Sequence, residues 1–189
     1  GAAFGAGFTV SNDSDAGAGS FRQALLDANG GAGPHTITFS SAYTITLAAE
    51  LPAITQSGIT INGNGSTLLG TSLADGSHGL RLLSDDNVVS NLRIHGFPEE
   101  KILITGSENV IQGCWIGTDG TLMENGTIGI LIDGGASNTI GGGTGQGNSL
   151  VGNGGDAIRI QGASAVNNRI AGNLIGFLPD GVKIGRAHV

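Results

Sequence analysis

One pattern occurs twice in this chain, as NVIQGCWIGTDG at residues 109–120 and as NRIAGNLIGFLPDG at residues 168–181. In both segments an Asn is followed two positions later by Ile, then by alternating apolar residues, an Ile-Gly pair and a turn that ends in Asp-Gly. Alternation with a period of two is typical of β-strands, and Asp-Gly favours a tight turn. The recurrence therefore indicates a repeat built from short strands rather than from helices.

The repeat extends over most of the chain when the sequence is aligned on its apolar-x-apolar triplets. The triplets LRL, ILI, ILI and IRI begin at residues 80, 102, 130 and 158. Each is followed by an Asn-centred element, which begins at residue 87, 109, 138 or 168, and then by a third element, which begins at residue 92, 114, 148 or 173. ITF and ITL within residues 37–47, and ITI at residues 59–61, have the form of earlier and less regular units.

Three short strands per unit predict an all-β fold, a single-stranded right-handed parallel β-helix of about six coils. Successive coils of this solenoid stack at ~4.8 Å, so equivalent residues form ladders. We expect two apolar ladders in the core, one from Leu82, Ile104, Ile132 and Ile160 and one from Val89, Ile111, Ile140 and Ile170. We also expect an amide ladder, which we interpret as architecture rather than as a binding stripe, from Asn87, Asn109, Asn138 and Asn168.

The segment GSFRQALLDANGG at residues 19–31 is the one convincing helix of the sequence. Ser20 is its predicted N-cap, and Gln23 is expected to complete a capping box. Gly30 is expected to end the helix in the left-handed conformation. An amphipathic helix at this place is expected to cap the open end of the solenoid with an apolar face that comprises Phe21, Ala24, Leu25 and Ala28.

Composition narrows the function classes. The chain holds 8 Lys and Arg residues against 15 Asp and Glu residues, and its net charge of −7 argues against a nucleic-acid partner. No apolar run approaches the ~18 residues of a membrane span, so we expect no membrane insertion. The single cysteine, Cys114, excludes a disulfide framework and a cysteine zinc site, and the alternation of its strand places it inward as a small core residue.

We divide the chain into three parts: an N-terminal strand and capping helix at residues 1–35, the parallel β-helix at residues 36–183, and a tail at residues 184–189. The tail, IGRAHV, has no partner in the repeat, and it is also the translation of ATC GGA AGA GCA CAC GTC, which matches a common sequencing-library adaptor. We therefore expect the tail to be non-native. We also expect the β-helix to continue into further coils or modules in the full-length chain.

The N-terminal segment carries a family resemblance. Residues 8–39, FTVSNDSDAGAGSFRQALLDANGGAGPHTITF, resemble the start of secreted bacterial right-handed β-helix proteins. Within them GSFRQA is similar to the motif of the CSLREA-type domain, with Gly19, Phe21 and Gln23 in place of Cys, Leu and Glu. The units NVIQGCWIGTDG at residues 109–120 and LIDGGASNTIGG at residues 131–142 resemble repeats of the same exported proteins. The resemblance thus covers nearly all of residues 7–181 and implies an exported bacterial protein, extracellular or at the cell surface. The function it favours is a structural or adhesive module whose partner is a polysaccharide or cell-surface glycan.

The alternative is a carbohydrate-active enzyme, a polysaccharide lyase or glycoside hydrolase of the pectate-lyase-like fold. Glycoside hydrolysis requires two carboxylates that flank the bond. The chain has Asp85-Asp86 and His95-Gly96 but lacks the Asn-Thr-Asp and Arg-Ile-Lys elements of the polygalacturonase pattern, and the basic residues that a lyase requires are sparse. We therefore name no catalytic residue within this segment.

Two sites follow from the stacking register. Asp86 precedes Asn87 as Glu108 precedes Asn109, so these two carboxylates should lie one coil apart with Asp85 beside them. Two negative charges at such a short distance favour a bridging cation, so calcium is the one cofactor that we consider. The alternative is that the two carboxylates are solvated turn residues without a bound ion.

The second site is an aromatic surface. Cys114 and Ile116 point inward, so Trp115 should point outward, with Arg93 in the same column one coil earlier. An exposed Trp is the usual platform for a sugar ring, and an Arg can stack on it. We expect glycan contact at Trp115 and Arg93, with an aromatic shelf that covers the strands as the alternative.

Overall fold

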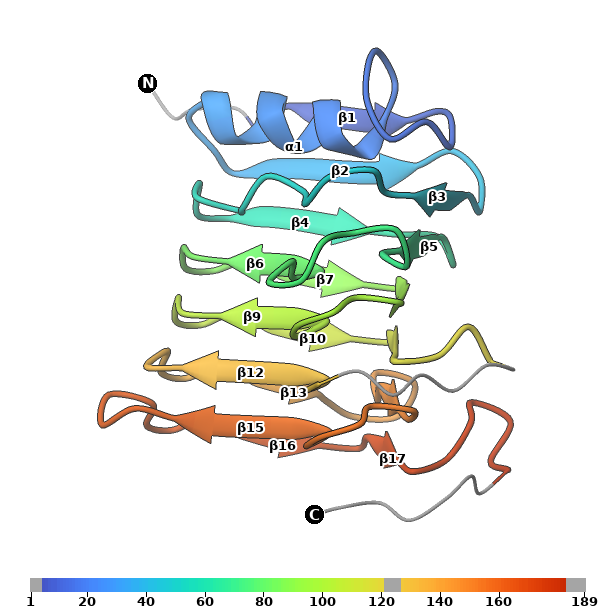
Figure 1. The fold of residues 1–189 in the computed structure, drawn as a ribbon. Coiled ribbons are helices and arrows are strands. Elements are labelled where there is room, and N and C mark those ends of the chain that lie inside the picture. The colour runs from blue at the N-terminus through green and yellow to red at the C-terminus, as the bar shows by residue number, and fades with distance from the viewer. Residues whose placement is uncertain (1–4, 121–126, 183–189) are drawn as a thin grey trace.

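The computed structural model of this chain describes residues 5–120 and 127–182. The described residues form short strands in three parallel sheets and a single α-helix, so the fold is all-β apart from that helix (Figure 1). From β6 onward the chain visits the four-stranded, the seven-stranded and the six-stranded sheet in turn and then begins again. The predicted tail, residues 184–189, lies outside the described residues.

Each sheet collects one of the three elements seen in the sequence repeat. The four-stranded sheet consists of β6 (Leu80–Leu82), β9 (Ile102–Ile104), β12 (Ile130–Asp133) and β15 (Ile158–Gln161). The seven-stranded sheet consists of β1 (Gly7–Val10), β2 (His35–Phe39), β4 (Ile59–Asn62), β7 (Val88–Ser90), β10 (Val110–Gln112), β13 (Thr139–Gly141) and β16 (Arg169–Ala171). The six-stranded sheet consists of β3 (Thr44–Thr46), β5 (Thr67–Leu69), β8 (Arg93–His95), β11 (Trp115–Ile116), β14 (Ser149–Leu150) and β17 (Leu174–Ile175).

The register confirms both apolar ladders. Leu82 pairs with Ile104, Ile104 with Ile132, and Ile132 with Ile160. Val89 pairs with Ile111, Ile111 with Ile140, and Ile140 with Ile170. Alternation along each strand sends these side chains into a core that runs between the three sheets, and the first three members of each ladder are fully buried.

The predicted amide ladder is present and is made of hydrogen bonds between neighbouring passes of the chain. The backbone N–H of Asn87 donates to Oδ1 of Asn109 at 3.0 Å, and the N–H of Asn109 donates to Oδ1 of Asn138 at 2.8 Å. The N–H of Asn138 donates in turn to Oδ1 of Asn168 at 2.8 Å. Asn87, Asn109 and Asn138 are fully buried, so each side chain satisfies a backbone donor that water cannot reach.

A second amide ladder was not expected. The N–H of Cys114 donates to Oδ1 of Asn148 at 2.9 Å, and the N–H of Asn148 donates to Oδ1 of Asn173 at 2.9 Å. The Asn148 side chain also donates to the carbonyl of Ile111 at 2.9 Å. The signal for this ladder was the recurrence of Asn at the first position of the third element, at 148 and again at 173.

The helix α1 (Phe21–Gly30) buries the four predicted residues Phe21, Ala24, Leu25 and Ala28, and it lies with β1 at one end of the sheets (Figure 1). Ser20 is the N-cap, because its Oγ accepts a hydrogen bond from the N–H of Gln23 at 3.1 Å. Two details of the prediction are wrong. The Gln23 side chain donates to Asp27 at 2.8 Å instead of returning to Ser20. The helix ends at Gly30 as expected, but Gly30 is not left-handed, and the C-cap Gly31 is extended, with φ −106° and ψ 166°.

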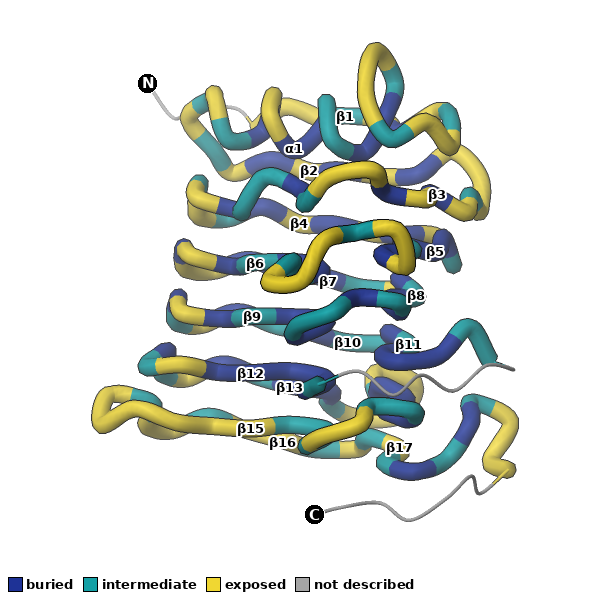
Figure 2. The backbone as a smooth tube through the Cα atoms, in the orientation of Figure 1, coloured by how far each residue is buried: buried dark blue, intermediate teal, exposed yellow. Residues whose placement is uncertain are grey.

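Exposure changes along the stack (Figure 2). Ile160 and Ile170, at the last strands of their sheets, are each 41% exposed, although their register partners Ile132 and Ile140 are fully buried. No described strand covers these two side chains on their outer side. Leu82, on the opposite edge strand of its sheet, is fully buried and pairs with Ile54 through an isolated bridge. None of the helical segments described is long and apolar enough to cross a membrane.

The first prediction tests the amide ladder. Replacing Asn138 by Ala removes the acceptor of the buried Asn109 N–H, and an orphaned buried donor costs ~1–3 kcal/mol. We expect Asn138→Ala to lower the free energy of unfolding by about that amount in urea denaturation. The exposed Thr105→Ala is the control and should change stability by less than ~0.5 kcal/mol. Equal effects of the two substitutions would contradict a structural role for the ladder.

The second prediction compares two isoleucines of one column. Ile132 is fully buried and Ile160 is 41% exposed, so the two sites differ in burial but not in residue type or strand position. We expect Ile132→Ala to destabilise the fold by ~2–5 kcal/mol, the range for a buried Ile, and Ile160→Ala to cost less than half as much. Urea denaturation of both variants measures the difference, and a larger loss at Ile160 would contradict the core described above.

Candidate functional site

The aromatic surface expected from the sequence is present on the six-stranded sheet. Trp115 of β11 pairs in register with Arg93 of β8, and the Arg93 guanidinium carbon lies 4.0 Å from the centre of the Trp115 ring. Both side chains are half-buried rather than buried. The predicted stacking is therefore confirmed, and one face of the ring is occupied by Arg93. Gly120 lies against the six-membered ring, where a Cβ on Gly120 would come 2.8 Å from Trp115 Cζ3.

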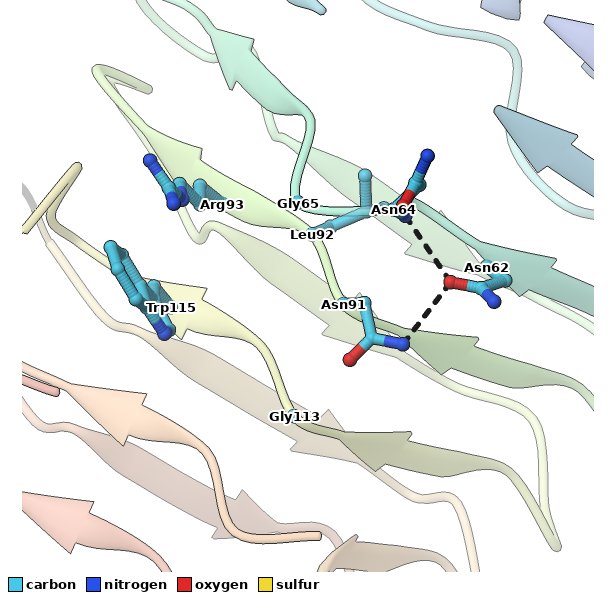
Figure 3. Close-up of a pocket in the computed structure, with 8 residues that line it drawn as sticks. All are labelled: Asn62, Asn64, Gly65, Asn91, Leu92, Arg93, Gly113 and Trp115. Atoms are coloured by element: carbon cyan, nitrogen blue, oxygen red, sulfur yellow. Dashed lines mark hydrogen bonds between the residues drawn. The ribbon is translucent and has the colours of Figure 1, made fainter. Parts of the chain in front are cut away.

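Arg93 and Trp115 form one wall of a groove of about 370 Å³. Asn62, the last residue of β4, also lines the groove. The rest of its lining comes from the connections between the seven-stranded and the six-stranded sheet and comprises Asn64, Gly65, Asn91, Leu92 and Gly113. Figure 3 shows the Arg93 and Trp115 side chains on neighbouring strands and the three asparagines beyond them. We call this feature the asparagine groove. Its volume lies within the range of about 300–1,000 Å³ that is usual for small-ligand sites.

The three asparagines of the groove are held by one another. Asn62 Oδ1 accepts from the Asn91 side-chain amide at 3.1 Å and from the N–H of Asn64 at 3.2 Å (Figure 3). Among the described residues nothing bonds to the Asn62 amide nitrogen or to Oδ1 of Asn91. The groove therefore presents a fixed amide donor and a fixed amide acceptor to whatever occupies it.

Two backbone features keep this arrangement open. Asn64 and Asn91 adopt left-handed φ values of 50° and 56°, which asparagine tolerates better than most residues. Gly113 has φ 62°, and a Cβ there would lie 2.9 Å from Asn91 Oδ1. A side chain at position 113 would therefore crowd the free acceptor of the groove. These positions were not predicted, because the sequence shows only turn residues there and not that two turns meet.

The carboxylates proposed for calcium lie at the turns that enter the seven-stranded sheet. Asp86 and Glu108 each have φ 59° and occupy equivalent positions directly before Asn87 and Asn109. Oδ1 of Asp85 accepts from the N–H of Ser107 at 2.7 Å, so this carboxylate already holds the neighbouring turn. No group of three His, Cys, Asp or Glu side chains within residues 5–120 and 127–182 is placed to hold a metal ion. Within this described part of the chain, Asp85, Asp86 and Glu108 are therefore not brought together as a three-ligand calcium site.

A second set of charges was missed by the sequence reasoning. Glu50 accepts from the N–H of His78 through Oε1 at 2.8 Å and pairs with Arg81 through Oε2 at 2.8 Å. His78 Nδ1 lies 2.8 Å from Glu100 Oε2 but is not aligned for a hydrogen bond. Both oxygens of Glu50 are engaged, and none of these residues lines the asparagine groove. The set ties together three turns beside the four-stranded sheet.

Cys114 takes the inward position expected for it. It is fully buried, its Sγ lies 3.4 Å from the carbonyl oxygen of Gln112, and its N–H belongs to the second amide ladder. Burial raises the pKa of the Cys114 thiol from 9.0 to about 12. The thiolate is the reactive form, so this cysteine is not a nucleophile at neutral pH.

Neither a protein-family model nor a curated protein sequence matches this chain.

The third prediction concerns Cys114. At about pH 8 the raised pKa leaves almost no thiolate, and burial denies access to reagents. We expect an aromatic disulfide reagent to label the native protein at least ~100-fold more slowly than the protein in denaturing urea. The absorbance of the released thiolate follows both rates. Labelling of the native protein at the rate of the unfolded chain would show that the thiol is accessible.

Proposed function

We propose that this chain is a structural or adhesive module of an exported bacterial surface protein and that it binds glycan in the asparagine groove. The observation that carries the proposal is the composition of the groove. A half-buried aromatic ring and a guanidinium lie beside three amide side chains in about 370 Å³. Sugars present apolar ring faces and many hydroxyl groups, and aromatic rings and amides are the groups that bind both.

The proposal includes a finer description of the fold. We infer that the three parallel sheets are the faces of a single-stranded right-handed parallel β-helix. The repeated order of visits to the sheets supports a solenoid, since each new strand pairs with the strand of the preceding pass. Parallel crossover connections are right-handed in nearly all proteins, which supports the handedness. A rigid stack of this kind suits a surface module, because it presents side chains at fixed spacing along its length.

The cellular location rests on the sequence resemblance. The GSFRQA segment, similar to the CSLREA-type motif, spans the N-cap and the first turn of α1. Its Ser20 and Phe21 are buried where the helix meets the strands, which gives the motif a capping role. We propose an extracellular or cell-surface location on this basis, with further coils or modules in the full-length chain.

The groove favours binding over hydrolysis. Hydrolysis of a glycoside requires two carboxylates on either side of the bond, and no Asp or Glu belongs to the described lining of the groove. The Glu50 and Glu100 carboxylates are engaged with Arg81 and His78 outside it. The enzyme of the pectate-lyase-like fold therefore remains the second candidate, with no observation in its favour.

The fourth prediction tests the groove. Trp115 is the single tryptophan of the chain, so its fluorescence reports on this site without labelling. We expect an oligosaccharide selected on a glycan array to change Trp115 emission saturably. Asn62→Ala should weaken that binding roughly 3- to 10-fold, the effect of one lost neutral hydrogen bond.

The control is Thr38→Ala, since Thr38 is exposed and pairs in register with Asn62 one strand away, outside the groove. It should leave the affinity unchanged. Saturable binding that Thr38→Ala and Asn62→Ala weaken equally would place the glycan elsewhere on the surface. An array with no bound glycan would contradict the proposed function.

A further inference from the structure

Arg93 differs from the other arginines for which the structure describes an ion pair. Arg22 pairs with Asp15, Arg81 with Glu50 and Arg159 with Asp156, at 2.7 or 2.8 Å. Arg93 has neither a carboxylate nor a hydrogen-bond acceptor as partner among the residues that the structure describes, although it is half-buried. In a chain with nearly twice as many acidic as basic residues, a half-buried guanidinium without a partner is unusual.

The stacking on Trp115 explains how such a guanidinium is held. The Arg93 guanidinium carbon lies over the ring, 4.0 Å from its centre, and no described residue accepts a hydrogen bond from its N–H groups. These donors form a rigid fork whose geometry matches a carboxylate. Trp115 therefore fixes the orientation of Arg93 without neutralising its charge.

The surroundings of Arg93 also favour a ligand that carries a carboxylate. No acidic side chain belongs to the described lining of the groove, so nothing there competes for the guanidinium. The asparagines at the other side offer a free amide donor at Asn62 and a free acceptor at Asn91, which suit hydroxyl groups. A ligand that bonds to Arg93 on one side of the groove and to the asparagines on the other carries a carboxylate and several hydroxyls on the same small ring.

We propose that the ligand of the asparagine groove is an acidic sugar, a hexuronate unit whose carboxylate pairs with Arg93 while its hydroxyls bond to Asn62 and Asn91. This inference rests on the proposed glycan function and adds the chemical class of the sugar. The pair forms in a partly desolvated groove, where a charge-assisted hydrogen bond contributes more than a neutral one. The proposal makes Arg93 the specificity-determining residue and Trp115 the residue that positions it.

The experiment uses three matched probes in Trp115 fluorescence titrations of the whole protein. Short oligoglucuronates carry the carboxylate, their methyl esters keep the ring and hydroxyls without the charge, and the carboxyl-reduced oligoglucoses replace it by a hydroxymethyl group. We expect the oligoglucuronates to bind roughly 10- to 100-fold more tightly than either neutral probe, the usual worth of a hydrogen bond to a charged group.

Variants assign the difference to Arg93. Arg93→Gln should remove the preference for the charged probe, so that the oligoglucuronate and the neutral probes bind with similar affinity. The control is Arg159→Gln, because Arg159 is exposed on the four-stranded sheet and pairs with Asp156 outside the groove. Circular dichroism and thermal melting of both variants check that the fold is retained, and the comparison of the three probes on the unmodified protein does not depend on any variant.

Each outcome bears on a different claim. Equal binding of charged and neutral probes would overturn the acidic-sugar inference and leave the glycan function standing. The same holds if Arg93→Gln lowers the affinity for all three probes by the same factor. If none of the three probes changes Trp115 emission while another glycan from the array binds, the hexuronate assignment is wrong. If no glycan binds at all, the proposed function fails together with it.

Discussion

The rest of the structure depends on one interaction, the hydrogen bond from a buried backbone N–H to the side-chain oxygen of an asparagine in the next pass of the chain. A polypeptide that turns from one sheet into another must bend inside the protein, and a bend breaks the ladder of backbone hydrogen bonds. Each bend leaves a backbone N–H without a partner in the sheet. At Asn87, Asn109 and Asn138 this N–H is buried, where water cannot satisfy it. The stacked amides satisfy these donors, so the bends repeat at the same place in each pass.

The amide ladders also set the register of everything on either side of them. A one-residue slip in a strand sends its side chains to the opposite face, so apolar alternation by itself leaves several pairings to compete. The bond from Asn109 to Asn138 admits one pairing, and it brings Ile111 over Ile140 and Ile104 over Ile132. The second ladder at Asn148 and Asn173 does the same where the chain enters the six-stranded sheet. Core packing and polar bonding therefore specify the same arrangement.

The asparagine groove is a consequence of that arrangement and not a separate structure. Trp115 and Arg93 meet because they hold equivalent positions in neighbouring passes. Asn62 pairs in register with Ser90, and Asn91, the next residue, reaches Asn62 through its side-chain amide. The stack thereby turns side chains that are far apart in the sequence into a surface with fixed spacing. A groove made in this way is pre-organised, since Asn62, Arg93 and Trp115 lie on strands whose positions are set by the core. Pre-organisation of this kind supports the glycan binding that we propose.

The sequence by itself determined the three-element repeat, both apolar ladders, the first amide ladder, the buried face of α1 and the pairing of Trp115 with Arg93. The ladders and the Trp115–Arg93 pair follow from the period of the repeat, because a residue that recurs at one position of a stacked repeat must lie over its equivalent. The buried face of α1 follows from the spacing of apolar residues along a helix. Only the tertiary structure decided what periodicity does not encode. The groove requires that Gly113, which has no side chain, leave Oδ1 of Asn91 uncrowded. The conformation at the end of α1 depends on the chain beyond it. The charged residues around Glu50 join turns of unequal length. These features arise from irregular connections between strands, whose paths are set by packing against distant parts of the chain and not by local pattern.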